Sequence, residues 1–129
     1  MSTELIPEEV SRFILDNIES VAQLEALILL RSNPDRHWSI EELAGRLYIS
    51  EKQTAEVLAL LGSQGFARVN SGEPPRYFYQ PDSASLKSIA DQLSAVYAKH
   101  LVPVTNLIHS KARTRVQKFA DAFRLRKDE

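Results

Sequence analysis

Apolar residues recur along this chain with two different periods, and each period predicts one kind of element. Up to about residue 65 they recur every three or four positions, which is typical of helices with one buried face. Helices are predicted to begin near Pro7, Ser20, Ser39 and Ser50. Proline suits the first helical turn, and each of these serines is followed three residues on by Gln or Glu, as in a capping box. Only Tyr48-Ile49 separates the last two helices, so we expect them to pack at a sharp angle as a helix-turn-helix.

After Gly65 the period changes to two, which predicts β-strands. Strands are expected at residues 66–69 and 76–79, joined by a turn-rich loop that contains Gly72 and two prolines. The chain then returns to helical spacing, with one apolar stripe from residue 86 to 101 and another from 108 to 123. Pro103 is expected to break or kink the chain between them. The predicted fold is mainly α with a small β-hairpin.

This order of elements resembles the winged helix-turn-helix family of bacterial transcription regulators, most nearly its MarR-like branch. The resemblance rests on VAQLEALILL (21–30), SIEELAGRLYIS (39–50), EKQTAEVLALLGSQGFARV (51–69) and RYFYQP (76–81). It implies a winged helix-turn-helix with additional N- and C-terminal helices. The domains would be an N-terminal helix at 1–19, the winged helix-turn-helix at 20–81 and C-terminal helices at 82–129, used for dimerisation.

The resemblance also implies where double-stranded DNA would bind, since in such regulators the helix after the turn enters the major groove. The outward face of that helix is expected to carry Lys52, Gln53, Glu56, Leu60 and Ser63, with Ala55, Leu58, Leu61 and Gly62 facing inward. The expected DNA contacts are Ser50, Lys52, Gln53 and Thr54 on this helix, and Arg68 and Arg76 beside the tip of the hairpin. An alternative for the two arginines is a role as strand-edge charges that maintain solubility.

The charge pattern supports a second hypothesis beside DNA binding. Residues 1–65 hold five basic and eleven acidic side chains, whereas residues 103–129 hold seven basic and three acidic ones; the whole chain carries −1. Glu56 lies in the middle of the expected reading face, where it would repel phosphates, and Leu60 would suit a protein interface. The alternative function is therefore a winged-helix adaptor that binds a protein partner through Glu56 and Leu60.

The two C-terminal apolar stripes require a cover, because neither is expected to remain in water. They either fold back on their own domain or form a two-fold homodimer. We favour the homodimer, since readers of palindromic DNA sites need that symmetry. Its expected anchors are Leu93, Val116, Phe119 and Phe123.

Other kinds of chemistry find little support in the sequence. There are no cysteines, and His37, His100 and His109 are not at metal-ligand spacing, so no enzyme, cofactor or metal site is expected. No apolar run approaches the roughly 20 residues of a membrane span, and Met1–Val10 does not resemble a signal peptide, so we expect a cytoplasmic protein without a membrane partner. Trp38 is interpreted as a core aromatic; the alternative is the wall of an effector pocket shared with Tyr97 and His100.

Overall fold

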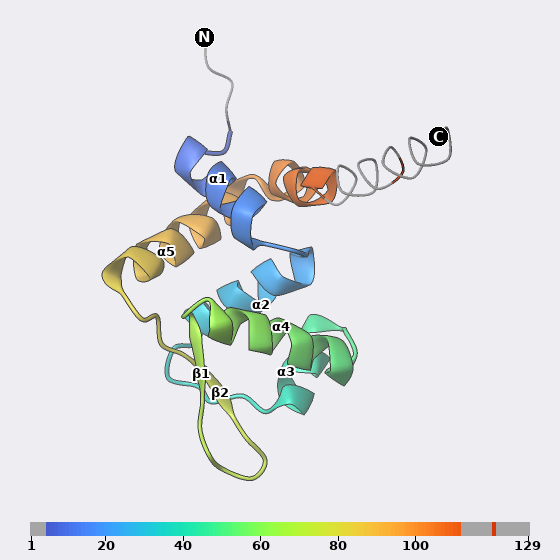
Figure 1. Ribbon diagram of the computed structural model, residues 1–129, viewed down its shortest axis with the longest axis vertical. Coiled ribbons are helices and arrows are strands. Elements are labelled where there is room, and N and C mark those ends of the chain that lie inside the picture. Colours follow the sequence, from blue (N-terminus) through green and yellow to red (C-terminus); the bar gives the residue numbers. More distant parts are fainter. Residues whose placement is uncertain (1–4, 112–119, 121–129) are drawn as a thin grey trace, which may run out of the picture.

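Helices and a hairpin form in the predicted order in the computed structural model, which describes residues 5–111 and residue 120 (Figure 1). The elements are α1 (Glu8–Asn17), α2 (Val21–Ser32), α3 (Ile40–Leu47), α4 (Glu51–Ser63), β1 (Ala67–Val69), β2 (Tyr77–Tyr79) and α5 (Ala84–Lys99). Residues 101–111 are also helical. The predicted fold class, mainly α with a small antiparallel hairpin, is confirmed.

The serine caps form as the sequence predicts. The hydroxyl groups of Ser20, Ser39 and Ser50 each accept a hydrogen bond, 3.0–3.1 Å long, from the backbone N–H three residues on. At Ser39 the return bond is also made, because the Glu42 carboxylate accepts from the Ser39 N–H at 3.0 Å. The Gln23 side chain accepts instead from the N–H of Glu19, at 2.7 Å. These bonds satisfy backbone donors that a helix start leaves free, and so they fix where α2, α3 and α4 begin.

The hairpin carries a one-residue third strand at Trp38. β1 pairs antiparallel with β2, with Ala67 opposite Tyr79. The Trp38 N–H donates to the Tyr77 carbonyl at 2.8 Å, and the Tyr77 N–H donates to the Trp38 carbonyl at 2.7 Å. The Trp38 side chain is 0% exposed, which confirms its role as a core aromatic. A side chain without exposed surface cannot line an open effector pocket, so that alternative for Trp38 is wrong.

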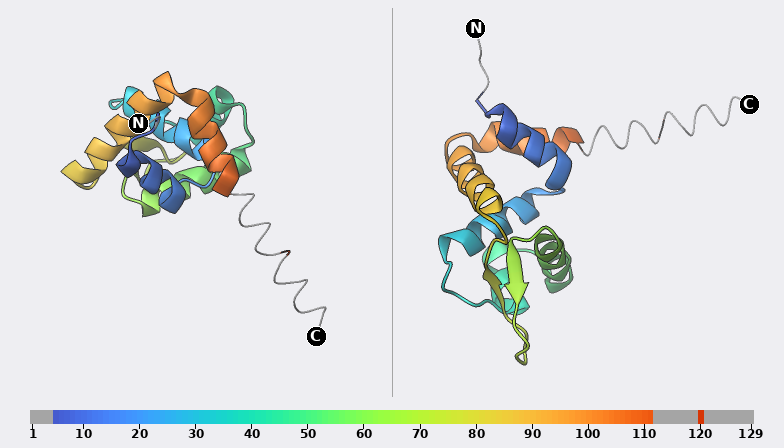
Figure 2. Two further views of the ribbon diagram at one scale, coloured as in Figure 1. Left: turned by 90° about the horizontal axis from the view of Figure 1, so that it is seen from above. Right: turned by 60° about the vertical axis from the view of Figure 1, so that its left-hand side comes forward.

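The core is a single cluster to which α1 to α5 and the hairpin all contribute side chains. α2 lies at its centre, against α3, α4 and α5, and it also touches β2. α1 packs on α5 at the end of the molecule opposite the hairpin tip (Figure 2). The helix-turn-helix and the hairpin therefore share one end, and α1 with α5 forms the other.

The helix is expected to break or kink at Pro103, and it breaks three residues earlier, at His100. α5 ends at Lys99, and His100 leaves the helical conformation with φ −133° and ψ 51°. The next helical stretch begins at residue 101, which places Pro103 in its first turn. Proline is tolerated there because it needs no N–H bond to a preceding turn. Breaking at His100 thus leaves helix on both sides of the proline.

Leu93 does not fit its predicted role as a dimer anchor. Its side chain is 1% exposed and belongs to the chain's own core. The apolar stripe of α5 is covered within the monomer at this point, so Leu93 has no surface for a partner. The other predicted anchors, Val116, Phe119 and Phe123, lie outside the described residues.

We therefore expect Leu93→Ala to lower the free energy of unfolding by about 2–5 kcal/mol, as for other leucines removed from a packed core. Urea unfolding followed by circular dichroism measures the loss. The control is Val69→Ala, whose side chain is 52% exposed, and which should change stability by roughly 0.5 kcal/mol or less. A Leu93→Ala protein that keeps its stability but loses self-association would restore Leu93 as a dimer anchor.

Candidate nucleic-acid interface

The turn between α3 and α4 is closed by backbone geometry at Tyr48. This residue ends α3 in the left-handed conformation, with φ 59° and ψ 41°, and its N–H bonds to the Ala44 carbonyl. The N–H of Ile49 donates to the same carbonyl at 3.2 Å. A left-handed residue reverses the chain at a helix end, as glycine commonly does. The two helices are therefore joined by the short turn from Tyr48 to Ser50, and the residues at the start of α4 are exposed.

The buried face of α4 differs by one position from the predicted face. Its buried residues are Thr54, Val57, Leu58 and Leu61, whereas Ala55 is half-buried and Gly62 is exposed. Thr54 is 0% exposed, and its hydroxyl donates to the Ser50 carbonyl at 2.8 Å. Its predicted DNA contact is therefore wrong, because its only side-chain polar group faces the helix backbone inside the core.

The first turn of α4 presents polar side chains to solvent. Ser50, Glu51, Lys52, Gln53 and Glu56 are all exposed. Lys52 has no ion-pair partner among residues 5–111, so its ammonium group is available to a ligand. Leu60, expected on the same exposed face, is half-buried, which reduces the apolar surface that a protein partner could use.

Arg68 and Arg76 flank the loop between the strands, and each is paired with a carboxylate. Arg68 donates to Asp82 at 2.9 Å, with both side chains about half exposed. Arg76 donates to Glu42 at 3.1 Å and to the His37 carbonyl at 3.4 Å. The capping box predicts the bond between Glu42 and Ser39, but the spacing of residues does not indicate this second bond from Arg76. The Arg76–Glu42 pair ties the hairpin to the start of α3.

Glu42 is a junction between the helix cap and two arginines. Besides the bonds from Ser39 and Arg76, its carboxylate lies 3.8 Å from the Arg36 guanidinium, which also lies over the Trp38 ring at 3.7 Å. The hydrogen bond from the Ser39 N–H, aided by the charge of Arg76, lowers the pKa of the Glu42 carboxyl from its ordinary value. The surroundings of Glu42 therefore favour the ionised form of its carboxyl group.

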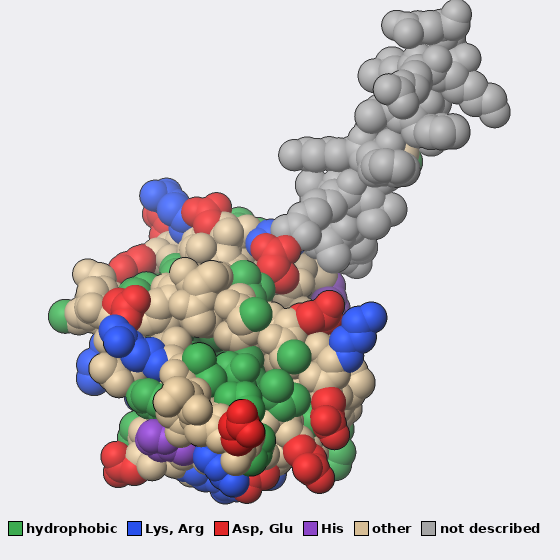
Figure 3. All heavy atoms as spheres, turned by 60° about the horizontal axis from the view of Figure 1, so that its bottom comes forward, with side chains coloured by type: hydrophobic (Ala, Val, Ile, Leu, Met, Phe, Trp, Pro, Cys, Tyr) green, Lys and Arg blue, Asp and Glu red, His purple; other side chains and the backbone are tan. Residues whose placement is uncertain are grey.

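A groove of about 480 Å³ lies between the hairpin loop and the starts of α3 and α4. Its lining includes Pro74, Pro75 and Arg76 from the loop and three carboxylates, those of Glu41, Glu42 and Glu51. Figure 3 shows this end of the molecule, where acidic and basic side chains surround apolar ones. Residues 35–79 hold five basic and six acidic side chains. The surface is therefore mixed in charge, and it attracts phosphates only at individual cations.

Two other kinds of site find no support in the part of the chain that the structure describes. Within residues 5–111, no group of three His, Asp or Glu side chains is placed to hold a metal ion. No described helix is long and apolar enough to cross a membrane.

The fold is shared with several solved regulators. No family model and no curated protein matches the chain. The Mycobacterium tuberculosis transcriptional regulator MosR aligns with TM-score 0.56 at 15% identity, covering 92% of this chain and 86% of that one. The adhesin competence repressor AdcR of Streptococcus pyogenes aligns with TM-score 0.53 at 18% identity, over 88% and 84% of the two chains. A Staphylococcus aureus MepR variant bound to an oligodeoxyribonucleotide aligns with TM-score 0.55 at 7% identity, over 90% and 88%.

These similarities confirm that the chain has the winged helix-turn-helix fold of MarR-like regulators, as the sequence resemblance indicated. In this fold α4 is the helix after the turn, and the β1–β2 hairpin is the wing. The neighbours named above are regulators or a DNA complex, and none is described as an enzyme.

We expect Glu42→Gln to weaken the contact between wing and α3 in a pH-dependent way. Because the pKa of Glu42 is lowered in the folded state, its ionised form stabilises the fold above the ordinary value of 4.5, and this contribution is lost as pH falls through the lower, folded-state pKa. Thermal unfolding should show a deficit for Glu42→Gln at pH 7 that narrows at pH 3. The neighbouring exposed Glu41→Gln serves as control. An equal deficit at both pH values would contradict a role for the charge.

Proposed function

We propose that this chain is a winged-helix transcription regulator that binds double-stranded DNA as a homodimer. The observation that carries the proposal is the exposed first turn of α4, with Lys52 and Gln53, beside a wing flanked by Arg68 and Arg76. The regulators of the same fold, one of them bound to an oligodeoxyribonucleotide, support it. α4 would enter the major groove, and the wing would lie along the backbone or the adjacent minor groove.

Each exposed side chain has a defined chemical task in this proposal. Gln53 can make two hydrogen bonds to adenine, and Lys52 can reach guanine or a phosphate. Ser50 accepts from Gln53 as the helix cap but keeps its hydroxyl hydrogen, which can be donated to a phosphate oxygen. Thr54 takes no part, because it is buried.

The wing arginines would exchange partners when DNA binds. Arg68 leaves Asp82, and Arg76 leaves Glu42, for phosphate oxygens. All four side chains are at least 40% exposed, and exposed ion pairs contribute only about 0–1 kcal/mol, so the exchange costs little. In free protein the same pairs hold the guanidinium groups near the loop, where the backbone would pass.

The carboxylates of the interface favour selective over non-specific binding. Glu51 and Glu56 lie on the exposed face of α4, where they repel any phosphate that comes close. Glu56 can accept a hydrogen bond from the amino group of cytosine, so a site with cytosine at that position offsets the repulsion. A mixed surface of this kind binds random DNA weakly and depends on base contacts for its affinity.

Exposed apolar side chains at the far end of the molecule support self-association. Four large apolar side chains at this end are 40–62% exposed. They are Leu5, which precedes α1, Leu15 on α1, and Leu101 and Val102, which follow α5. In the proposed homodimer these side chains would contribute to the subunit interface, as exposed apolar patches commonly do. A partner on this end leaves both α4 helices free for the two half-sites of a palindrome.

DNA binding should weaken as salt concentration rises, and the steepness of that dependence is set by the number of cations that contact phosphates. In each copy these cations are Lys52, Arg68 and Arg76. Three cations in each of two copies predict that log Kobs falls against log salt with a slope of roughly −5 at most. Lys52→Ala should weaken binding and reduce that slope by roughly 2, because each dimer loses two contacts. Titration of fluorescent random-sequence duplex, and of the DNA upstream of the protein's own coding sequence, measures both.

The control for this titration is Lys99→Ala, an exposed lysine on α5 far from the wing, which should bind like the wild type. Preference for the upstream fragment would indicate autoregulation. Absence of binding to either duplex at low salt would overturn the proposal and direct the search to protein partners.

The dimer is tested separately, without DNA. We expect Phe119→Ala combined with Phe123→Ala to yield monomers or aggregates, because large aromatic anchors dominate such interfaces. Sedimentation equilibrium gives the mass, and circular dichroism shows whether the core has folded. A well-folded dimer of this double variant would contradict the assignment of these anchors.

A further inference from the structure

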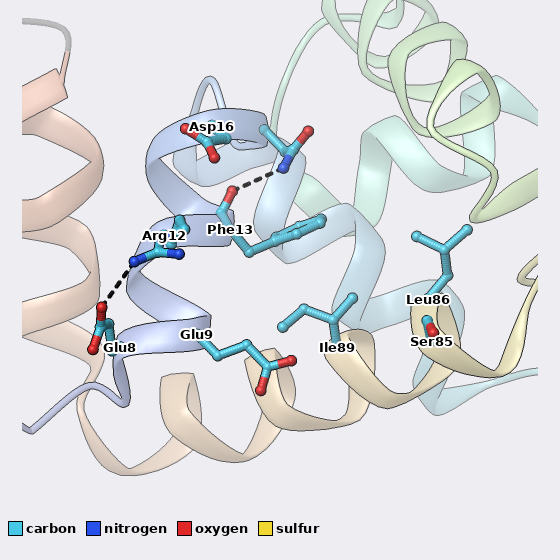
Figure 4. Close-up of a pocket in the computed structure, with 9 residues that line it drawn as sticks. Glu8, Glu9, Arg12, Phe13, Asp16, Ser85, Leu86 and Ile89 are labelled. Carbon is cyan, nitrogen blue, oxygen red and sulfur yellow. Dashed lines mark hydrogen bonds and ion pairs between the residues drawn. The ribbon is translucent and has the colours of Figure 1, made fainter.

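A hollow between α2, the end of α3 and the second half of α5 lies apart from the candidate nucleic-acid interface. It has a volume of about 450 Å³, and its apolar lining consists of Ile28, Leu29, Leu47, Tyr48 and Tyr97. A different cleft, of about 560 Å³ between α1 and the first half of α5 (Figure 4), belongs to the end of the molecule already proposed for the homodimer. None of the residues that line the hollow beside Tyr48 is among the exposed apolar side chains of that end or among the proposed DNA contacts. Neither the homodimer nor DNA binding therefore accounts for this hollow.

Tyr48 stands at the rim of this hollow, almost entirely in solvent. It is 93% exposed, the highest value among the large exposed apolar residues of the described part of the chain. It also has the left-handed conformation that ends α3, with φ 59°, where glycine is the usual residue because a Cβ atom is disfavoured there. Within residues 5–111 its hydroxyl makes no hydrogen bond and its ring stacks on no other ring. The chain thus keeps a strained aromatic residue that gains nothing from the rest of the monomer, and tyrosine is a frequent anchor of protein interfaces.

The wall of the hollow is held in place by the core and by one hydrogen bond. Ile28, Leu29, Leu47 and Tyr97 are half-buried and pack against the core cluster. The Tyr97 hydroxyl donates to the Glu25 carboxylate at 2.9 Å and so links α5 to α2. Burial, together with this bond to Glu25, raises the pKa of Tyr97 to about 12, so the hydroxyl keeps its proton at neutral pH. The hollow is therefore formed before any occupant arrives, and it offers an apolar wall to an aromatic ring.

Two side chains of opposite charge border the hollow, and neither has an ion-pair partner among the described residues. Arg46, near the end of α3, is exposed and lies 5.6 Å from the centre of the Trp38 ring. Glu25, on α2, is also exposed and accepts the bond from Tyr97. The surface thus presents a projecting ring beside a hollow, and a cation beside an anion. A surface that holds both members of each pair is complementary to itself, as a two-fold contact between identical chains requires.

We propose that this surface binds the same surface of a second copy of the chain. The Tyr48 surface, as we call it, comprises Tyr48, the hollow beside it, Arg46 and Glu25. Tyr48 of each copy enters the hollow of the other, and Arg46 of each copy meets Glu25 of the other. This contact is separate from the homodimer proposed at the α1 end, so it joins homodimers to one another. Lys52 and Gln53 do not line the hollow, so neither takes part in the contact.

Removal of the Tyr48 ring tests the contact. In sedimentation of the full chain, the mass should double as concentration rises, whether the species at low concentration is a monomer or the proposed homodimer. We expect Tyr48→Gly to weaken this doubling at least about tenfold, because the ring that enters the hollow is lost. Glycine favours the left-handed conformation of this position, so thermal unfolding of Tyr48→Gly should occur at no lower temperature than in the wild type.

Exchange of the two charges tests the symmetry of the contact. Glu25→Arg alone and Arg46→Glu alone place like charges opposite each other twice, and each should weaken the doubling at least about tenfold at low salt. One chain that carries both changes has opposite charges facing each other again and should regain most of the wild-type affinity. This double variant also lacks the bond from Tyr97 to Glu25, so its recovery excludes loss of that bond as the cause. The control is Glu73→Arg, an exposed acid in the hairpin loop, which should leave the doubling unchanged.

Three results would overturn the Tyr48 contact. The first is a wild-type mass that does not rise with concentration. The second is a doubling that Tyr48→Gly leaves unchanged, as expected if the terminal helices alone associate or if the hollow serves another molecule. The third is a double variant that associates no better than either single variant. None of these measurements contains DNA, so the Tyr48 contact holds or fails independently of DNA binding.

Discussion

The packing of one face of α4 determines what the rest of the molecule can do. Thr54, Val57, Leu58 and Leu61 bury that face, and α2 and α3 pack against the helix. Because a helix has fixed angular spacing, burying these positions obliges Lys52, Gln53 and Glu56 to point outward. The Ser50 cap and the left-handed Tyr48 then determine where α4 starts relative to α3. The proposed reading surface is thus a consequence of core packing.

Local features of this fold could be predicted from the sequence because their causes are local. The start of α3 follows from Ser39 and Glu42, which exchange hydrogen bonds three residues apart. The spacing of apolar residues changes from helical to alternating after Gly65, and this change correctly predicts the hairpin. The predicted inward face of α4 begins at Ala55, whereas the observed buried face begins one residue earlier, at Thr54. Hydropathy does not distinguish the two, because alanine is small and threonine is polar. Thr54 enters the core because its hydroxyl is satisfied by the Ser50 carbonyl.

Features that depend on distant residues could not be predicted in this way. Arg76 and Glu42 are 34 residues apart, and Arg68 and Asp82 are 14 apart, so no spacing rule indicates either pair. The same limit applies to Leu93, which belongs to an apolar stripe that the chain covers itself. The α1–α5 cleft likewise arises only from tertiary packing. In each case the sequence pattern indicates that a residue is charged or apolar, but its partner depends on how distant parts of the chain pack together.

Nuclear magnetic resonance tests, residue by residue, the proposal that the end of the molecule formed by α4 and the wing binds DNA. Isotope-labelled protein would be titrated with the duplex that binds best, and backbone amide shifts would be followed. We expect perturbations concentrated in residues 50–56, at the start of α4, and in residues 68–76 of the wing, with α1 unaffected. Perturbations confined to α1 and α5, or none at saturating duplex, would contradict it.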